Sequence, residues 1–457
     1  MAAKRYFIMA AALFGALSCA SPPAPTANAQ PAPQQASQRA PTPPIPAPGS
    51  APDIYIHAGR LLADPASGRV LTEQTVVVRA GRIVSITPGY ADPGAAEAID
   101  LRSAFVLPGL IDSHVHITSE LGPDDRINTF LKTSSDTALD GAGYALKTLH
   151  AGFTTIADLG ANPEAILALR SAIARGVVPG PRILASAGAI SVHGGHGDAN
   201  GMPHDMALIL RPDGVCSGAD DCRRAVRERV RDGADIIKIT ATGGVLSDTA
   251  AGLGQQFTDE ELTAIVQAAH AMGRQVTAHA HGVDGVNSFL RAGGDSIEHG
   301  TYSDAESVRL YKQNGAYLIP TLMAGDFVAR EAQKPGTYLQ PAQVQKALQA
   351  GPQMLDMLRR MHEAGVKIAF GTDTGVSAHG DNAQEFALMV RAGMTPLEAI
   401  TAATNNAADH FRLSHEIGTI SPGKAADIIA VDGDPLVDVR ELESVDFVMK
   451  GGVVYVD

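Results

Sequence analysis

Short apolar runs recur along the middle of the chain, and most of them are followed by a stretch whose apolar residues are spaced as in an amphipathic helix. One such stretch, residues 258–272, opens with Thr258 and three acidic residues, which is typical of a helix start. Another covers residues 341–364. Buried-type strands that alternate with helices, eight in all, predict an α/β fold with a (β/α)8 barrel of the TIM type. The runs are residues 107–117, 153–158, 182–186, 235–240, 275–281, 295–299, 317–322 and 367–372.

Both ends of the chain around this middle are rich in short β-like pieces that Gly and Pro turns separate. The β-like pieces that precede the predicted barrel predict a small antiparallel unit. The pieces that follow the barrel have the same β-rich pattern. We therefore expect one small composite β-sandwich domain formed by both termini, residues 54–109 and 406–457, beside a barrel of residues 110–405. The β-like pieces are residues 54–56, 75–78, 82–86, 98–101, 427–431 and 445–455.

The N-terminal segment has the pattern of a secretory signal, which we assign to residues 1–20. Two basic residues precede an apolar run over residues 6–17, and this run is too short to span a membrane comfortably. Two processing routes remain open. Cleavage after Ala29 would follow a small-x-small pattern, whereas acylation of Cys19 would follow an imperfect lipoprotein box.

Residues 21–53 form a linker that is rich in Pro, Ala, Gln and Ser. Such a composition buries little apolar surface and predicts an extended tether. We therefore expect an exported protein of the periplasm or cell envelope, attached to a membrane only through a lipid on Cys19. In an oxidising compartment Cys216 and Cys222 could pair as a disulfide, and the alternative is two free thiols.

The overall composition excludes several classes of protein. Hydrophobic residues make up 45% of the 457 residues and charged residues 19%, which is typical of a soluble globular chain. The net charge of −13 argues against a nucleic-acid partner, which would require a basic face for phosphates. Outside the signal segment no apolar stretch is long enough for a polytopic membrane protein.

Side chains that bind metals stand at or near the ends of five of the apolar runs. His114 and His116 end the first run two residues apart, so in a strand both imidazoles point to the same side. In a barrel the C-terminal ends of all strands meet at one face, where barrel enzymes keep their active sites. Each residue alone could be structural, but the whole set in this order predicts a metal site. The candidate ligands are His114, His116, Lys238, His279, His299 and Asp373, with His281 two residues after His279.

This set resembles the amidohydrolase superfamily in its two-metal form, over about residues 54–457. The family pattern is HxH on strand one, a carboxylated Lys on strand four, His on strands five and six and Asp on strand eight, and every position is filled here. The resemblance implies two divalent metal ions, with Zn²⁺ as the expected metal, bridged by a carbamate formed from CO₂ on Lys238. It implies amide hydrolysis by a metal-bridging hydroxide, with Asp373 and His281 as catalytic residues. Asp373 would pass the proton to the leaving nitrogen.

Three loops, residues 191–198, 241–245 and 279–282, look like the imidazolonepropionase-like branch that contains Xaa-Pro dipeptidases and ochratoxin-type amidases. Imidazolonepropionase itself lacks the bridging lysine, so Lys238 argues against that activity. The branch implies a small-molecule or dipeptide substrate with a free carboxylate, such as an N-acyl amino acid, and a homo-oligomer. The expected substrate contacts are His193, His196, His281 and Tyr302.

Two other functions fit the same residues. One is a cyclic-amide, lactone or organophosphate hydrolase that uses the same binuclear site. The other is a non-catalytic, metal-stabilised binding protein of the cell envelope. Products released from linear amides distinguish the first alternative from a dipeptidase, and turnover distinguishes the second.

Overall fold

The computed structural model describes residues 52–247 and 252–457. The expected signal segment, Cys19 and the linker up to residue 51 lie outside the described residues. Among the helices in the described part of the chain, none is both long enough and apolar enough to cross a membrane.

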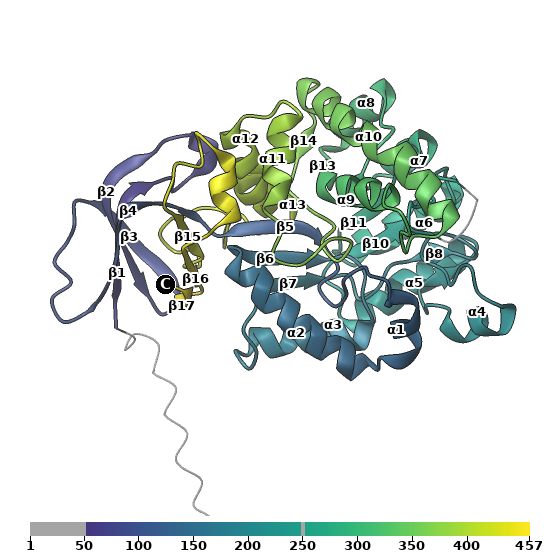
Figure 1. Cartoon of the computed structure of the whole chain (residues 1–457), viewed down its shortest axis with the longest axis horizontal. Coiled ribbons are helices and arrows are strands. Elements are labelled where there is room, and N and C mark those ends of the chain that lie inside the picture. The colour runs from purple at the N-terminus through teal and green to yellow at the C-terminus, as the bar shows by residue number, and fades with distance from the viewer. Residues whose placement is uncertain (1–51, 248–251) are drawn as a thin grey trace, which may run out of the picture. The chain divides into compact units, whose positions relative to one another are not determined.

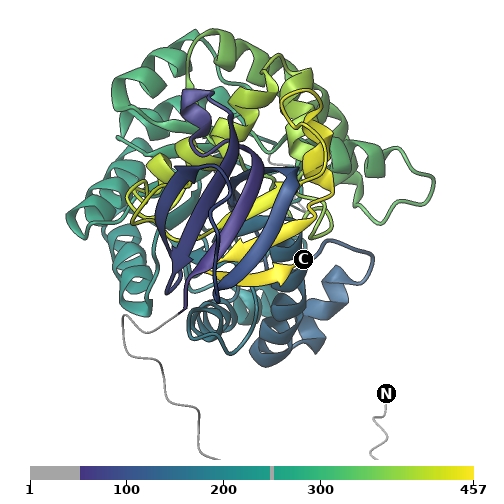
Figure 2. The same cartoon turned by 90° about the vertical axis from the view of Figure 1, so that its left-hand side faces the viewer.

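One sheet joins the two ends of the chain. Its strands are β1 (Ile54–Leu61), β2 (Leu71–Arg79), β3 (Arg82–Pro88), β4 (Glu97–Pro108), β15 (Ile428–Val431), β16 (Phe447–Lys450) and β17 (Val453–Val456). Their order is β17-β16-β15-β4-β1-β2-β3, so β4 lies between an N-terminal and a C-terminal strand. Figure 2 shows the purple and yellow strands side by side in this sheet.

The pairing within this sheet differs from the antiparallel unit expected for the N-terminal pieces. β4 runs parallel to β1 and antiparallel to β15. The β2 and β3 strands pair with each other on one side of β1, and the chain then returns to the other side of β1 as β4. Alternation of apolar residues sets which face of a strand is buried but not which strand is its neighbour, so the sequence did not reveal this order.

The other named strands all pair in parallel. β5 (Leu110–Val115), β6 (Phe153–Asp158) and β7 (Arg182–Ala185) form one sheet. β10 (Ile237–Thr240), β11 (Val276–Ala280), β12 (Ser296–His299), β13 (Tyr317–Ile319) and β14 (Lys367–Ile368) form another. Parallel bridges at Val115–Thr374 and Ile190–Ile239 link the two sheets. The short strands β8 (Ser191–Val192) and β9 (Val215–Cys216) pair beside them. The fold is thus mixed α/β.

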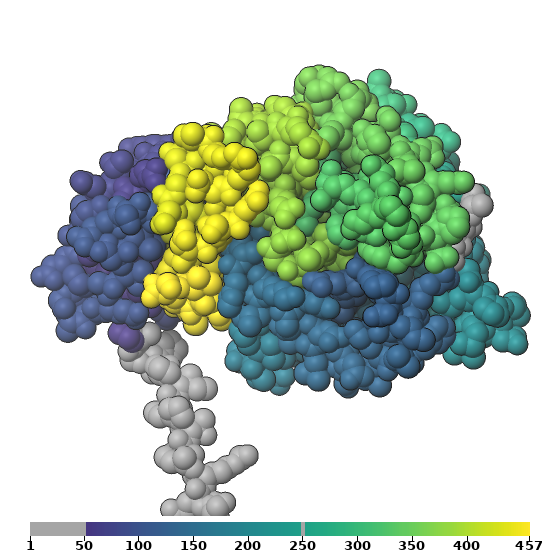
Figure 3. All heavy atoms as spheres, in the orientation of Figure 1, coloured from purple at the N-terminus to yellow at the C-terminus, as the bar shows by residue number. Residues whose placement is uncertain are grey.

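Helices follow most of the parallel strands and cover them (Figure 1). The predicted helix start at Thr258 is confirmed, because its side chain and that of Glu261 form a capping box. The helices are α1 (Asp125–Leu131), α2 (Ser134–His150), α3 (Pro163–Ala174), α4 (His204–Leu210), α5 (Ala219–Asp232), α6 (Asp259–Ala271), α7 (Val283–Arg291), α8 (Ala305–Asn314), α9 (Leu322–Ala332), α10 (Pro341–Glu363), α11 (Gln384–Arg391), α12 (Pro396–Thr401) and α13 (Ala407–His410). In the space-filling view, the C-terminal segment in yellow lies between the purple strands and the green helices (Figure 3).

The first apolar run, residues 107–117, was expected to be one strand, but the structure divides it between β4 and β5. Gly109 separates the two strands, and its N–H donates to the Asp427 carbonyl. A Cβ at Gly109 would lie 2.3 Å from the Thr154 hydroxyl oxygen, so only glycine fits this junction. The chain therefore passes here from the mixed sheet into the parallel strands.

Candidate metal centre

The parallel strands deliver their metal-binding side chains to one edge. Lys238 lies in β10 and His279 in β11, while His299 is the last residue of β12. His114 lies in β5. The stretch after β14 carries Asp373, whose N–H donates to the His114 carbonyl at 2.7 Å. Since the C-terminal ends of parallel strands share one edge, these side chains converge there.

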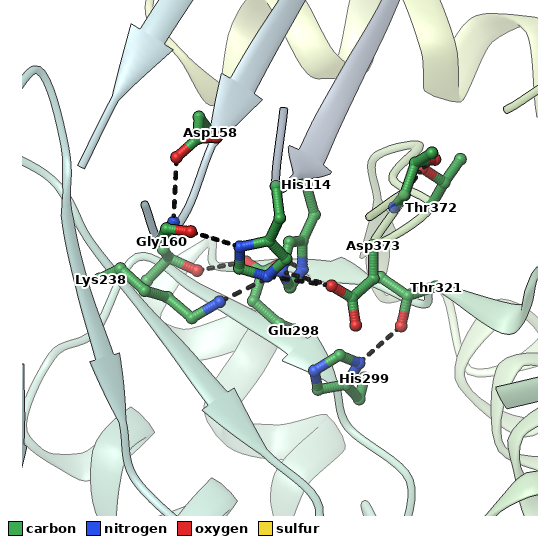
Figure 4. Close-up of polar contacts among 12 residues, drawn as sticks. His114, Asp158, Gly160, Lys238, Glu298, His299, Thr321, Thr372 and Asp373 are labelled. Carbon is green, nitrogen blue, oxygen red and sulfur yellow. Dashed lines mark hydrogen bonds and ion pairs between the residues drawn. The ribbon is translucent and has the colours of Figure 1, made fainter. Parts of the chain in front are cut away.

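His114, His116 and Asp373 form the first group of candidate ligands. The Oδ1 atom of Asp373 lies 3.3 Å from His114 Nε2 and 3.1 Å from His116 Nε2. Lys238 adjoins this group, with its Nζ 3.3 Å from His114 Nε2 (Figure 4). The amine and the carboxylate thus both approach the same ring nitrogen of His114.

His279, His281 and His299 form the second group, and their ligand atoms lie within 4.8 Å of one another. The His281 and His299 rings are stacked at 4.8 Å, and His279 meets His299 edge-on at 4.7 Å. The two groups adjoin, because the His114 and His299 rings are 5.4 Å apart. His281, expected as a substrate contact, therefore lies as close to the centre as the expected ligands.

The donor set fits divalent metal ions. Imidazole nitrogens and carboxylate oxygens are the ligands that Zn²⁺ prefers. Asp373 Oδ1 is buried and has no hydrogen-bond partner among the described residues, although two ring nitrogens face it. A cation between these atoms would satisfy all of them. His114, His116 and Asp373 could hold one ion and His279 and His299 a second, while Lys238 stands beside the first group.

Burial and the neighbouring charges shift the pKa values of both Asp373 and Lys238. Burial alone would raise the pKa of Asp373, but the imidazoles of His114 and His116 hold it well below its usual range. Burial lowers the pKa of Lys238 and outweighs the nearby carboxylates of Glu298 and Asp373. Asp373 is therefore an anion at neutral pH, and Lys238 gives up its proton more readily than a lysine in water does.

Polar partners orient the ring nitrogens that face away from the centre. Glu298 lies 2.8 Å from His114 Nδ1, and both side chains are 1% exposed. The Gly160 carbonyl accepts from His116 Nδ1 at 2.7 Å, and Asp158 in turn accepts from the Gly160 N–H. The Thr321 hydroxyl is 2.6 Å from His299 Nδ1 (Figure 4). Such partners set the ring orientation and leave Nε2 for the metal.

Sequence reasoning missed these partners. Glu298 directly precedes His299, but the alternation of a strand gives no sign that its carboxylate reaches across to His114. The available signal was an acidic residue within an apolar run, directly beside the candidate ligand His299.

His299, Thr321 and Asp373 have positive φ angles of 70°, 48° and 59°. Residues with a side chain rarely adopt this backbone conformation, and it clusters at functional sites.

The expected substrate contacts have different locations. His196 lines the cavity at the centre, and the centre of its ring lies 4.3 Å from that of the His279 ring. Burial lowers the pKa of His196 to about 3, so it is a neutral hydrogen-bonding group and not an imidazolium that could pair with a carboxylate. His193 and Tyr302 do not line this cavity. His193 is exposed and bonds the Ser217 hydroxyl at 2.6 Å.

The cavity has a volume of about 320 Å³, and its lining combines polar and apolar side chains. The polar part carries the histidines, Lys238 and Asp373. The apolar part, here called the apolar wall, comes from the loop after β10, from α9 and α10 and from the stretches near residues 121 and 376. Its larger side chains are Leu121, Val245, Leu246, Val328, Met354 and Val376.

Cys216 and Cys222 form a disulfide between β9 and α5.

Replacing Glu298 by glutamine is expected to weaken metal binding by about 10–100-fold, because His114 loses the charged partner that orients its ring. Competition for metal with a coloured chelator measures this change. Glu331→Gln is the matched control, since Glu331 on α9 is also buried but pairs with Lys334, just beyond the end of that helix. Equal metal affinity in the Glu298 variant and this control would contradict the role given to Glu298.

Comparison with known proteins gives a consistent picture. Residues 105–455 match the model of the amidohydrolase family. Ochratoxinase of Aspergillus niger is 32% identical over 428 residues, which cover 88% of this chain and 86% of that protein. The solved structure of a Xaa-Pro dipeptidase with methionine bound in its active site has a TM-score of 0.84 and 40% identity, over 89% of this chain and 100% of that one. A prolidase complexed with N-methylphosphonate-L-proline has a TM-score of 0.80 and 31% identity, over 88% and 99%.

Proposed function

Because the chain belongs to the amidohydrolase family and is a hydrolase that acts on amide bonds, we propose that its substrate is a dipeptide or an N-acyl amino acid with a free carboxylate. The observation that carries this proposal is the cavity, whose lining brings together two adjoining groups of candidate ligands and an apolar wall. A scissile amide at the histidines would place an apolar side group against Val245, Leu246 and their neighbours. The similarity to a Xaa-Pro dipeptidase and to ochratoxinase supports this class of substrate.

Two divalent ions, with Zn²⁺ as the proposed metal, would supply a Lewis acid for the carbonyl oxygen and lower the pKa of a water molecule. The protein's own part in the reaction is proton transfer and orientation. Asp373 is an anion at neutral pH and can take a proton from water and return it to the leaving nitrogen. His281 and His196 each have Nδ1 engaged, by the hydroxyls of Thr301 and Ser247, and present Nε2 to a substrate.

We further propose that Lys238 carries a carbamate. The neutral amine attacks CO₂ to form an N–C bond and releases one proton, which converts the side chain into an anion. The lowered pKa of Lys238 supports this step, since only the neutral amine is a nucleophile. The product would offer two oxygens beside His114, between the two groups of candidate ligands.

Metal-reconstituted protein incubated with libraries of dipeptides and N-acyl amino acids tests the proposed function. Mass spectrometry should detect free amino acids released from linear amides that bear an apolar side group. Ring opening of cyclic amides or lactones alone would contradict the proposal and favour the alternative hydrolase. Ligand binding without turnover would identify a binding protein.

The pairing of the strands and the apolar cores support two inferences about the architecture. We infer that β5–β7 and β10–β14 close into one (β/α)8 barrel over residues 110–405, since bridges link both pairs of sheet edges. We also infer that the seven-stranded sheet folds into a β-sandwich of residues 54–109 and 406–457. Its own apolar core, which includes Ile56, Val106 and Phe447, supports this.

We also propose that the protein is exported to the periplasm or cell envelope. We propose as well that it assembles as a homo-oligomer. The disulfide between Cys216 and Cys222 supports an oxidising compartment. The N-terminal mass of the mature protein would distinguish cleavage after Ala29 from a lipid on Cys19.

A further inference from the structure

Lys346 lies on α10, outside the parallel sheets, and is 6% exposed. Its ammonium donates to the carbonyl oxygens of Gly244 and Ser247, each at 2.7 Å. Taking an ammonium out of water costs several kcal/mol or more, so a buried lysine requires well-placed acceptors. These two carbonyls belong to the turn of residues 244–247, which follows β10, the strand that carries Lys238.

The same turn touches the metal centre through His196. The Ser247 hydroxyl lies 2.7 Å from His196 Nδ1 and accepts from the Gly244 N–H at 3.3 Å. The His196 ring lies so close to Gly244 that a Cβ there would be 2.3 Å from the ring Cε1. The centre of the His196 ring also lies 4.3 Å from that of the His279 ring, with the two rings tilted by 31°. A continuous set of contacts therefore runs from Lys346 to a candidate metal ligand.

The turn also forms part of the substrate cavity. Val245 and Leu246 line its apolar wall, and α10 contributes Ala350 and Met354 to the same wall. Lys346 joins the turn to this helix through the Gly244 and Ser247 carbonyls, and Gln343 of α10 adds a bond to the Leu246 carbonyl at 2.6 Å. The ammonium thus helps to set the distance between two parts of the wall that come from distant segments of the chain.

We propose that Lys346 is a positioning residue, which holds the 244–247 turn against α10 and thereby fixes both His196 and the apolar wall of the substrate cavity. This inference rests on the proposed function, because it assigns the apolar wall to the substrate group remote from the scissile bond. Lys346 touches neither metal nor substrate. Its removal should therefore impair binding more than the chemical step.

Lys346→Met keeps the length of the side chain and removes its donors. We expect KM for an N-acyl amino acid with a large apolar group to rise about tenfold, while kcat changes less than about threefold. In the metal-free protein, the backbone amides of residues 243–247 should exchange hydrogen faster than in the wild type. Lys450→Met is the matched control, since Lys450 is also partly buried and donates to the Gly180 carbonyl at 2.7 Å, but from the seven-stranded sheet.

Ser247→Ala distinguishes the proposed route from general destabilisation. If Lys346 acts through the turn and His196, the KM effects of the two substitutions should not add in the double variant. Additive effects, or a Lys346 variant that matches the Lys450 control in KM and in exchange, would overturn the inference. Exchange that rises throughout the protein would do the same. If the wild type hydrolyses no amide, the proposed function fails, whereas the exchange comparison still decides the role of Lys346.

Discussion

Replacement of Lys238 by alanine is expected to remove at least one of two bound metal ions and to lower kcat/KM by roughly 10³-fold or more. Lys238 lies 3.3 Å from His114 Nε2 in the first group of candidate ligands, and alanine has no amine that could carry the proposed bridging carbamate. Metal analysis of the purified variant, together with its rate on the best substrate of the library, measures both effects.

High bicarbonate should not restore the alanine variant, because the amine that binds CO₂ is gone. Lys450→Ala, in the seven-stranded sheet, serves as the matched control and should keep both metal ions and the wild-type rate. Two tightly bound ions and a normal rate in the Lys238 variant would refute the carbamate. Mass spectrometry of the metal-loaded wild type under gentle conditions would then show no added CO₂.

Asp373→Asn is expected to lower kcat by about 10²–10⁴-fold, the range found when a positioned proton-transfer group is lost. Asp373 Oδ1 faces His114 and His116 at 3.3 and 3.1 Å, so the amide oxygen of asparagine can still occupy this position, but it cannot accept and return a proton. Steady-state kinetics with the metal content measured in the same samples provide the test.

The outcome also separates an enzyme from a binding protein. A binding protein would keep its ligand affinity in the Asp373 variant and would have no turnover to lose. A wild-type kcat in a fully metal-loaded variant would show that Asp373 does not transfer the proton. Loss of metal without a further loss in the rate per bound metal would assign Asp373 to metal binding alone.

The sequence predicted those parts of the molecule that follow from local pattern. The runs 153–158 and 295–299 lie on β6 and β12 because buried parallel strands are short and apolar throughout. The resemblance to the amidohydrolase superfamily is confirmed by the match over residues 105–455. The six expected ligands lie together because strand ends that look unrelated in the sequence share one edge in a parallel sheet.

The parts that the sequence did not reveal depend on contacts between distant segments. Nothing in the pattern around Glu298 shows that it meets His114, and nothing on the amphipathic α10 marks Lys346 as buried against residues 244 and 247. The run 367–372 was expected to be a full strand, but β14 ends at Ile368. Phe370 then donates its N–H to the Ala402 carbonyl, outside the sheet.

The position of β4 in the seven-stranded sheet has a consequence for biosynthesis. One neighbour of β4 is β1, which the ribosome makes shortly before it, but the other is β15, which is made only after all the parallel strands. During translation one side of β4 therefore carries unpaired backbone groups, and such strand edges promote association between chains. A chaperone that shields nascent strands should raise the yield of this protein more than that of a protein whose sheets are built from consecutive segments.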